Sequence, residues 1–281
     1  MPIYVNTNTA SLFAQRQLTK SQDGASKSLQ RLSTGMRINS AADDAAGLAI
    51  STKFGAKIRG LNQASRNASD GISMIQTAEG GLEQMGGILT RMRELSVQSA
   101  NGSLTNDDRL FLQTEFTQLG NELDRIARST EFNGRNLLQG SASAGITFHI
   151  GTDNTSTDKI SVSITNVQSS KLGTVGTKLN AQAVSTVTKS TTSLGVIDAA
   201  IAQLSTARSK LGAAQNRLDV TIDNIGTSVE NLSAANARIR DSDIASETAA
   251  LTKNQILVQA GVSVLAQANQ APQVALSLIG G

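Results

Sequence analysis

Residues 254–281 of this 281-residue chain read NQILVQAGVSVLAQANQAPQVALSLIGG, and none of them is Asp, Glu, Lys, Arg or His. Leu251, Val258, Val262 and Leu265 recur at helical spacing. Leu257, Val264 and Ile256 fall beside or behind that stripe. A helix of this kind buries more than one face, because apolar residues occupy much of its circumference. We therefore expect protein to cover it on several sides.

A membrane span is the competing interpretation of an uncharged helix. Gln or Asn interrupts the segment at positions 255, 259, 267, 269, 270 and 273. A membrane-spanning helix needs an apolar run with few such interruptions. The segment therefore favours contacts with protein over contacts with lipid.

The beginning of the chain has the same character. No residue from Met1 to Gln15 is charged, and a helical stripe follows at positions 18, 22, 25, 29 and 32. Two charge-poor helical ends can pair with each other, and further copies of the chain can cover what they leave exposed. The sequence thus predicts self-assembly through residues of both ends: Leu18, Leu29, Leu32, Leu251, Leu257, Val258, Val262 and Leu265.

Composition argues against a compact enzyme-like domain. Aromatic residues make up 2% of the chain, Trp and Cys are absent, and the net charge is +3. Large aromatic anchors of a globular core are therefore rare, disulfides and thiolate metal sites are excluded, and the scattered basic residues do not form a nucleic-acid-binding patch. Residues 1–14 lack the positively charged region of a secretory signal peptide, so we expect any export to use another route.

The first two helices are outlined by their capping residues. Asn6 or Asn8 can cap a first helix that runs to about Ser33, where Gly35 tolerates left-handed geometry. Ser40, followed by Asp43 and Asp44, predicts the start of a second helix. From position 41 to about position 100 that helix would be roughly 90 Å long at about 1.5 Å per residue.

The middle of the chain contains shorter elements. Thr105, followed by acidic residues, predicts the cap of a third helix, and Asn133-Gly134 predicts a turn. Alternating apolar residues at 146–150 and 160–164 predict a β-hairpin. Residues 165–193 are rich in Ser, Thr, Gly and Gln, so we expect loop or irregular surface there rather than core.

The return helix is expected from Leu194. Its apolar residues recur every seventh position, at 204, 211, 218, 225, 232 and 239, and the phase slips between Ile239 and Ile244. We read the slip as a domain boundary. The predicted fold is mainly α, a long antiparallel helical coiled-coil bundle formed by the N- and C-terminal halves with a small β-hairpin region. Its inner coiled-coil domain comprises 1–42 and 241–281, and its spoke helical domain comprises 43–240, with the hairpin near 145–165 and an irregular loop at 166–193.

No catalytic, cofactor-binding or metal-binding constellation stands out. His149 is the single histidine, and strand alternation places it opposite Phe148, at an exposed position. Zinc-protease, phosphate-loop and nucleophile-elbow motifs are missing. We expect that the protein is not an enzyme and uses no cofactor.

Four segments carry a family resemblance: LSTGMRINSAADDAAGLAI at 32–50, LNQASRNASDGIS at 61–73, ARIRDSD at 237–243 and QAGVSVLAQANQ at 259–270. They resemble bacterial flagellin, and the likeness extends over about 1–140 and 190–281. Only the hairpin and a short loop remain between the two regions. The sequence therefore resembles a short flagellin that lacks the outer variable domains.

The resemblance implies a function and partners. Flagellins are exported unfolded through the flagellar type III apparatus and polymerise outside the cell into the tubular filament used for swimming. The implied partners are many copies of the same chain, the flagellar cap and hook-junction proteins, and an export chaperone at the C-terminal segment. A hook–filament junction protein or a non-flagellar secreted coiled-coil module would share the helical pattern and stay as alternatives.

One further implication concerns immunity. Flagellins that are recognised by a vertebrate Toll-like innate receptor carry residues matching Arg91, Leu95, Gln98 and Glu115. The first three share one helix face by their spacing, and we expect Leu95 to be half buried there.

Overall fold

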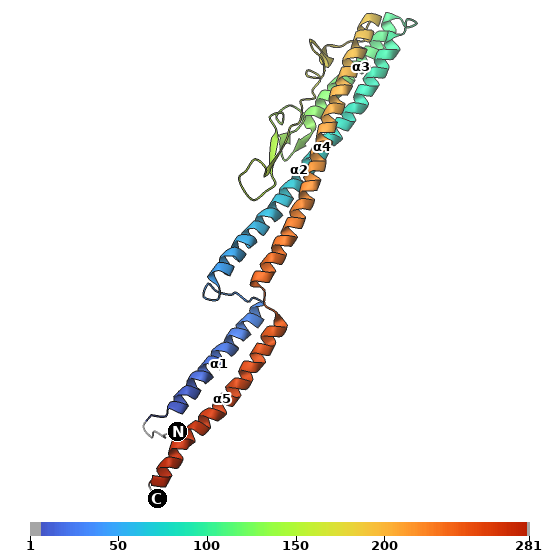
Figure 1. The fold of residues 1–281 in the computed structure, drawn as a ribbon. Helices are drawn as coiled ribbons and strands as arrows, with labels where there is room; N and C mark the ends of the chain where they lie inside the picture. The colour runs from blue at the N-terminus through green and yellow to red at the C-terminus, as the bar shows by residue number, and fades with distance from the viewer. Residues whose placement is uncertain (1–6, 280–281) are drawn as a thin grey trace. The chain divides into compact units, whose positions relative to one another are not determined.

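The computed structural model describes residues 7–279, with side chains placed from residue 7 to residue 270. In this range the chain forms five α-helices, one short 3₁₀ helix and three antiparallel strand pairs (Figure 1). The elements are α1 (Thr9–Thr34), α2 (Ala45–Ala100), α3 (Asn106–Ser129), β1 (Glu131–Phe132), β2 (Arg135–Asn136), β3 (Ile146–His149), β4 (Lys159–Val162), β5 (Gly173–Thr174), β6 (Thr177–Lys178), η1 (Leu179–Ala181), α4 (Val187–Arg240) and α5 (Ile244–Ile279). The expected fold class, mainly α with a small β region, is confirmed.

The chain divides into two compact units, and both are discontinuous in sequence. Unit 1 comprises Met1–Ala56 and Glu230–Gly281, and unit 2 comprises Lys57–Val229. The domain boundary expected at 42/43 and 240/241 falls within unit 1 and stays a prediction.

In unit 1, α1 and α5 run antiparallel. Asn8 caps α1 by accepting from the amide of Ser11 at 3.0 Å, and its side chain also donates to the carbonyl of Ala268 at 2.7 Å. At the other end of α1, Arg31 lies 3.5 Å from Glu247. Gly35 ends the helix with a φ of 69°, the left-handed geometry that glycine tolerates best.

The start of α2 differs from the prediction. Its first residue is Ala45, because Asp44 caps it by accepting from the amide of Gly47 at 2.8 Å. Asp43 instead accepts from Ser40 and Asn39 and closes the turn before the helix. Ser40 is therefore a residue of that turn and not the cap.

The predicted phase slip coincides with the break between α4 and α5. The two connections of unit 1 pair there as a short antiparallel bridge: Arg37 donates to the carbonyl of Arg240 at 2.6 Å, and Ser242 donates to the carbonyl of Gly35 at 2.9 Å. The backbone groups that the helix ends leave free thus satisfy each other.

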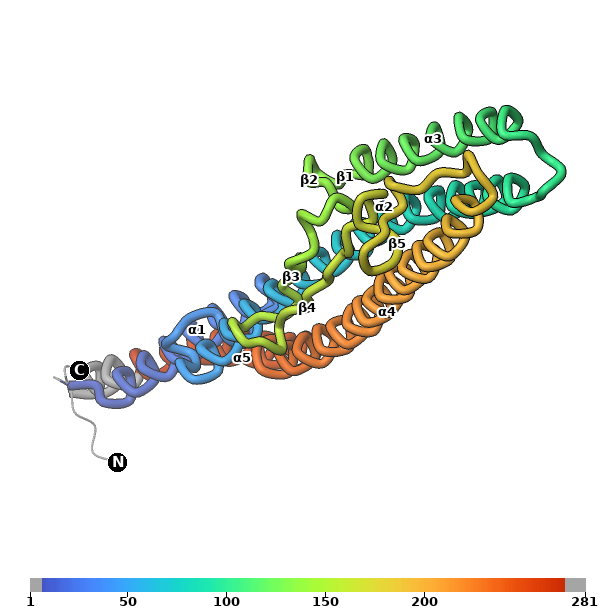
Figure 2. The backbone as a smooth tube through the Cα atoms, turned by 90° about the horizontal axis from the view of Figure 1, so that it is seen from above, coloured from blue at the N-terminus to red at the C-terminus, as the bar shows by residue number. Residues whose placement is uncertain are grey.

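In unit 2, α2, α3 and α4 run alongside one another (Figure 2). They share one hydrophobic core. Leu204, Leu211 and Leu218 of the heptad series are fully buried in it, against Leu82, Leu89 and other residues of α2. Gly71 of α2 lets the hairpin approach closely, since a Cβ at this position would lie 3.3 Å from the ring of Phe148. The heptad pattern therefore correctly predicted helix-on-helix packing.

The predicted turn at Asn133-Gly134 and the predicted β-hairpin are both confirmed. Strand β3 pairs with β4 in the register Phe148↔Ile160, and Asn133 and Gly134 take φ values of 50° and 73° between β1 and β2. Asn and Gly are the residues that accept such values in a tight hairpin turn.

The prediction for residues 165–193 was wrong in two respects. Val167, Leu172, Leu179 and Val184 are buried in the core, and α4 begins at Val187 rather than at Leu194. These apolar residues have no helical or strand period, so no pattern marked them as core. Side chains of the helices hold the segment in place: Asp124 accepts from Ser169, and Gln203 bonds both backbone groups of Gly173.

Candidate self-association surface

The seam between α1 and α5 is lined by small residues. Ala14, Ser21 and Ser28 are the buried residues of α1, spaced seven apart. On α5, Gly261 lies against Leu18, and Asn254 lies against Gly24 of α1. Small side chains let two helices approach closely, but they bury little apolar area.

The eight predicted self-assembly residues divide into two groups. Five are half-buried in the seam: Leu18, Leu32, Leu251, Val258 and Leu265. Leu29, Leu257 and Val262 point outward and are 60%, 41% and 53% exposed. The structure therefore does not bring all eight together, because the first group packs within the chain and only the second is free for other copies.

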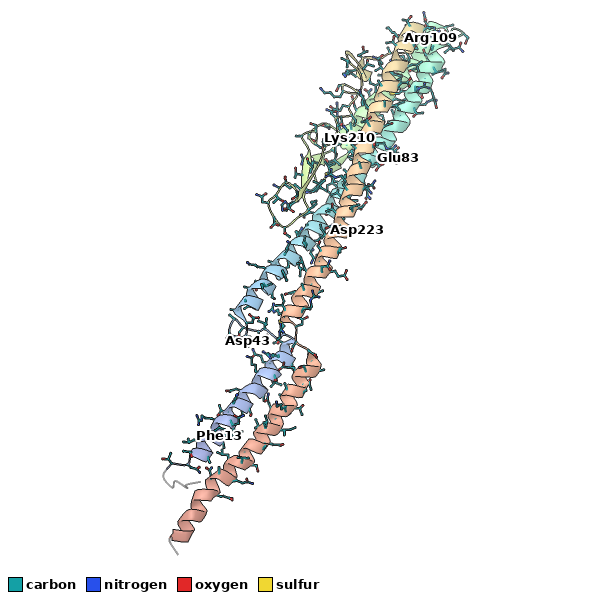
Figure 3. The ribbon with its side chains drawn as sticks, in the orientation of Figure 1. Phe13, Asp43, Glu83, Arg109, Lys210 and Asp223 are labelled. Carbon is teal, nitrogen blue, oxygen red and sulfur yellow. The ribbon has the colours of Figure 1, made fainter. Side chains whose placement is uncertain are left out.

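Five more large apolar residues of the same unit are exposed. Ile256 and Val264 of α5 fall outside the stripe, as the sequence indicated, whereas Leu12 and Phe13 of α1 and Ile244 of α5 were not predicted (Phe13 is labelled in Figure 3). The signal was present, since each is a large apolar residue outside the stripe of a charge-poor helix. The α1–α5 pair thus fully buries only small residues of α1 and leaves several large apolar residues exposed.

Two hollows follow this surface. A groove of about 990 Å³ runs along α5 alone and is lined by Ile244, Ala245, Thr248, Ala249, Thr252, Lys253, Ile256 and Leu257. A second, of about 800 Å³, lies between α1 and α5, with Gln22 and Gln255 among its lining residues. Lys253 is the one charged residue that lines either hollow.

Charges instead hold the α1 end of unit 1 in place. Lys27 lies 2.9 Å from Asp43, whose side chain is only 16% exposed. The ammonium group of Lys27, helped by hydrogen bonds from Ser40, holds the pKa of the Asp43 carboxyl well below its usual range. This ion pair ties α1 to the turn before α2.

The residues matched to the innate receptor lie in unit 2. Arg91 of α2 donates to Glu115 of α3 at 2.8 Å and to Glu94 at 3.0 Å, and these two carboxylates raise the pKa of its guanidinium. Gln98 is exposed nearby on α2. Leu95 is fully buried, so the expectation that it is half buried was wrong. It belongs to the hydrophobic core of unit 2, and spacing on α2 alone could not reveal which elements cover it.

Two other kinds of site are missing from the part of the chain that the structure describes. None of its helices is both long and apolar enough to cross a membrane. Its acidic residues and His149 form no cluster that could hold a metal ion. His149 is exposed on β3, as its place opposite Phe148 predicted.

Comparisons with known proteins cover nearly the whole chain. Residues 5–143 match the family model of the bacterial flagellin N-terminal helical region, and residues 194–279 match that of the C-terminal helical region. The chain is 43% identical to a flagellar filament 33 kDa core protein of Treponema phagedenis, over 98% of this chain and 99% of the relative. It is 44% identical to a flagellin of Halalkalibacterium halodurans, again over 98% and 99%.

A solved structure described as a putative flagellar hook-associated protein from Vibrio parahaemolyticus is similar with a TM-score of 0.60, over 71% of this chain and 100% of that one. Its sequence identity of 16% shows the fold alone and does not favour a hook–filament junction protein. The family models and relatives confirm the expected structural role and the expectation that the protein is not an enzyme. The chain belongs to the bacterial flagellin family, in a short form without a large variable domain, and is a structural subunit of a flagellar filament.

Proposed function

We propose that this flagellin polymerises through α1 and α5 into an extracellular helical tube that serves swimming, after export of the unfolded chain through the flagellar type III apparatus. One observation carries the proposal: the α1–α5 pair buries Ala14, Ser21 and Ser28 and leaves Phe13 and Ile256 exposed. Such a pair gains little by folding alone. Contacts with other copies supply the missing burial, so we expect the terminal helices to become ordered as the filament grows.

The exposed residues lie on both sides of the seam. At about 100° per residue, Leu257 and Val264 fall on one flank of α5, and Ile244 and Val262 fall on the other. Two different flanks make two different contacts. Contacts of that heterologous kind extend into a helical polymer when the rotation does not close a ring.

The face of α5 opposite the seam joins the two flanks. At about 100° per residue, Thr252, Ile256, Gln259 and Ser263 fall there, and all four are exposed. The hollow along α5 runs over this face, with Thr252 and Ile256 among its lining residues. Ile256 therefore gives this face apolar surface for a further copy as well.

The same exposed residues support the proposed contacts with an export chaperone and with the cap and hook-junction proteins. An export chaperone would take the apolar face of α5 in a groove, as amphipathic helices are commonly bound. The cap and hook-junction proteins would cover the ends of the filament, where one copy lacks a neighbour. Each competes with a further copy for the surface of α1 and α5.

We also propose recognition of the monomer by a Toll-like innate receptor. Arg91 and Glu115 support it, since both are exposed and held together at 2.8 Å on adjacent helices, with Gln98 nearby. Arg91→Ala should reduce the response of receptor-reporter cells to purified monomer, while Arg66→Ala, elsewhere on α2, should not. An unchanged response to Arg91→Ala would remove this part of the proposal.

Electron microscopy of the purified protein tests the main proposal. The full chain should form long tubes under polymerising conditions. Deletion of residues 255–281 should leave a soluble, helical monomer by circular dichroism that forms none, because it loses most of the exposed apolar surface of α5. Tubes from the truncated chain would contradict the assignment of polymerisation to α5.

A further inference from the structure

The first turns of α3 carry an exposed apolar pair beside acidic residues. Leu110 is 54% exposed and Phe111 is 76% exposed, although Arg109 between them and the cap is buried. Arg109 donates to the carbonyls of Ser99 and Asn101 at 2.9 Å each and so fixes this end of α3 to the end of α2. The pair is therefore presented outward from a rigid base.

Acidic charge accompanies the pair. Asp107 lies one helical turn before Phe111 and faces the same side. Asp108 completes the capping box with Thr105, whose hydroxyl lowers the pKa of its carboxyl. The surface of α3 thus combines an aromatic anchor with negative charge, the composition of an interface centre and its rim.

A groove of opposite character lies elsewhere in unit 2, between the β3–β4 hairpin and α4. Its volume is about 560 Å³, and its apolar lining consists of Ile150, Ile160 and Val220. Val220 is 68% exposed in it. The charged residues that line it, Lys159 and Arg217, are both basic.

One chain cannot bring these two surfaces together. His149 at the hairpin accepts from Asn67 of α2 at 2.9 Å, whereas Glu115 of α3 pairs with Arg91 of α2 at 2.8 Å. Positions 67 and 91 are roughly 24 residues apart on one helix, which corresponds to about 36 Å. Phe111 lies still farther along, as α3 runs antiparallel to α2 (Figure 2).

We propose that Leu110 and Phe111 of one copy dock in the groove between the β3–β4 hairpin and α4 of the next copy, with Asp107 facing Arg217 and Lys159. The inference rests on the proposed filament and names a contact of unit 2 that adds to those of α1 and α5. Because the two surfaces carry opposite charges, each binds the other in preference to a second copy of itself. The two surfaces differ, so the contact is heterologous. After each copy is added, one apolar pair and one groove remain free for the next copy.

Cross-linking tests the contact, because the chain has no cysteine of its own. Thr114→Cys lies one turn beyond Leu110, and Ser156→Cys lies on the lining of the groove, so all the proposed contact residues stay native. Filaments of this double variant, treated with a short bifunctional thiol reagent, should give a ladder of multimers on a denaturing gel. The matched control carries Val97→Cys with Ser156→Cys. Val97 is exposed near the end of α2 that Arg109 joins to α3.

The outcomes separate the two proposals. A ladder with Thr114→Cys and none with Val97→Cys supports the contact. Filaments without a ladder, or with equal ladders in both variants, overturn the contact and leave the filament function standing. A cysteine-free parent that forms no filaments overturns the proposed function and this inference with it.

A charge exchange provides a second, independent measurement. Arg217→Glu should raise the critical concentration for polymerisation by about tenfold, and Asp107→Lys in the same chain should restore it. Lys210→Glu, on α4 outside the groove lining, should change it by less than about twofold (Lys210 is labelled in Figure 3). An additive loss in the Asp107→Lys/Arg217→Glu variant would refute the pairing.

Discussion

Asp43 shows how one side chain can anchor a helix connection. It accepts from the amide of Ser40 at 3.1 Å and from the amide of Asn39 at 3.3 Å, and it pairs with Lys27 at 2.9 Å. All these partners favour the charged carboxylate, which keeps the pKa low. The adjacent acidic residues in the sequence indicated a helix start. That Asp43 lies in the turn and Asp44 caps the helix depends on the position of Lys27.

Asp43→Asn should lower the temperature at which filaments dissociate at pH 7, because the amide cannot pair with Lys27. A carboxyl whose pKa is depressed on folding stabilises the folded state above its unfolded pKa of about 3.9 and loses that stabilisation as the pH falls below it. The difference between wild type and variant should therefore shrink below about pH 4. Turbidity during heating at several pH values measures it, with the exposed Asp70→Asn as control. A difference that persists unchanged to pH 2.5 would argue against the ion pair as its cause.

Two neighbouring glycines of α2 differ in how closely other residues pack against them. A Cβ at Gly80 would meet no atom within 4 Å, whereas a Cβ at Gly81 would lie 2.7 Å from Oγ1 of Thr130. A glycine inside a helix can weaken it or let a neighbouring segment approach closely. Only the packing of the β1–β2 region decides that Gly81 serves close approach and that Gly80 faces open space.

Gly80→Ala should raise the free energy of unfolding by about 0.5–1 kcal/mol, because alanine restricts the unfolded chain and favours helix. Gly81→Ala should lower it, because Thr130 and Leu138 must shift to admit the new methyl group. Urea denaturation of the monomer, followed by circular dichroism, compares the two variants directly. Equal effects of the same sign would show that helix propensity outweighs packing at this position.

At the scale of the whole molecule, several large apolar residues of unit 1 point away from its own seam. Ile256 and Leu257 border the groove on α5 and are 60% and 41% exposed. Full burial of one such side chain contributes about 1.5–3 kcal/mol. The exposure of these side chains is unfavourable only as long as no other protein covers them.

Ile256→Ser with Leu257→Ser should therefore raise the critical concentration for filament growth by at least about tenfold, because each contact between copies loses apolar burial. The unfolding temperature of unit 2 in the monomer should stay the same. Gln267→Ser, at an exposed polar position of the same helix that lines neither hollow, is the control. Sedimentation of filaments at equilibrium measures the critical concentration, and unaltered growth of the double variant would contradict the role of this surface.

The sequence by itself determined the long helices, the β3–β4 hairpin and the break at 240–244, because period, caps and turn residues are local signals that survive without tertiary context. It also predicted that the uncharged ends contact other copies of the chain. Only the tertiary structure decided which apolar residues pack within the chain and which remain free, placing Leu265 in the seam and Leu257 outside it. It also decided the burial of Leu95 and of Val184, since a periodic pattern specifies a face of one element, whereas burial depends on which other elements cover that face.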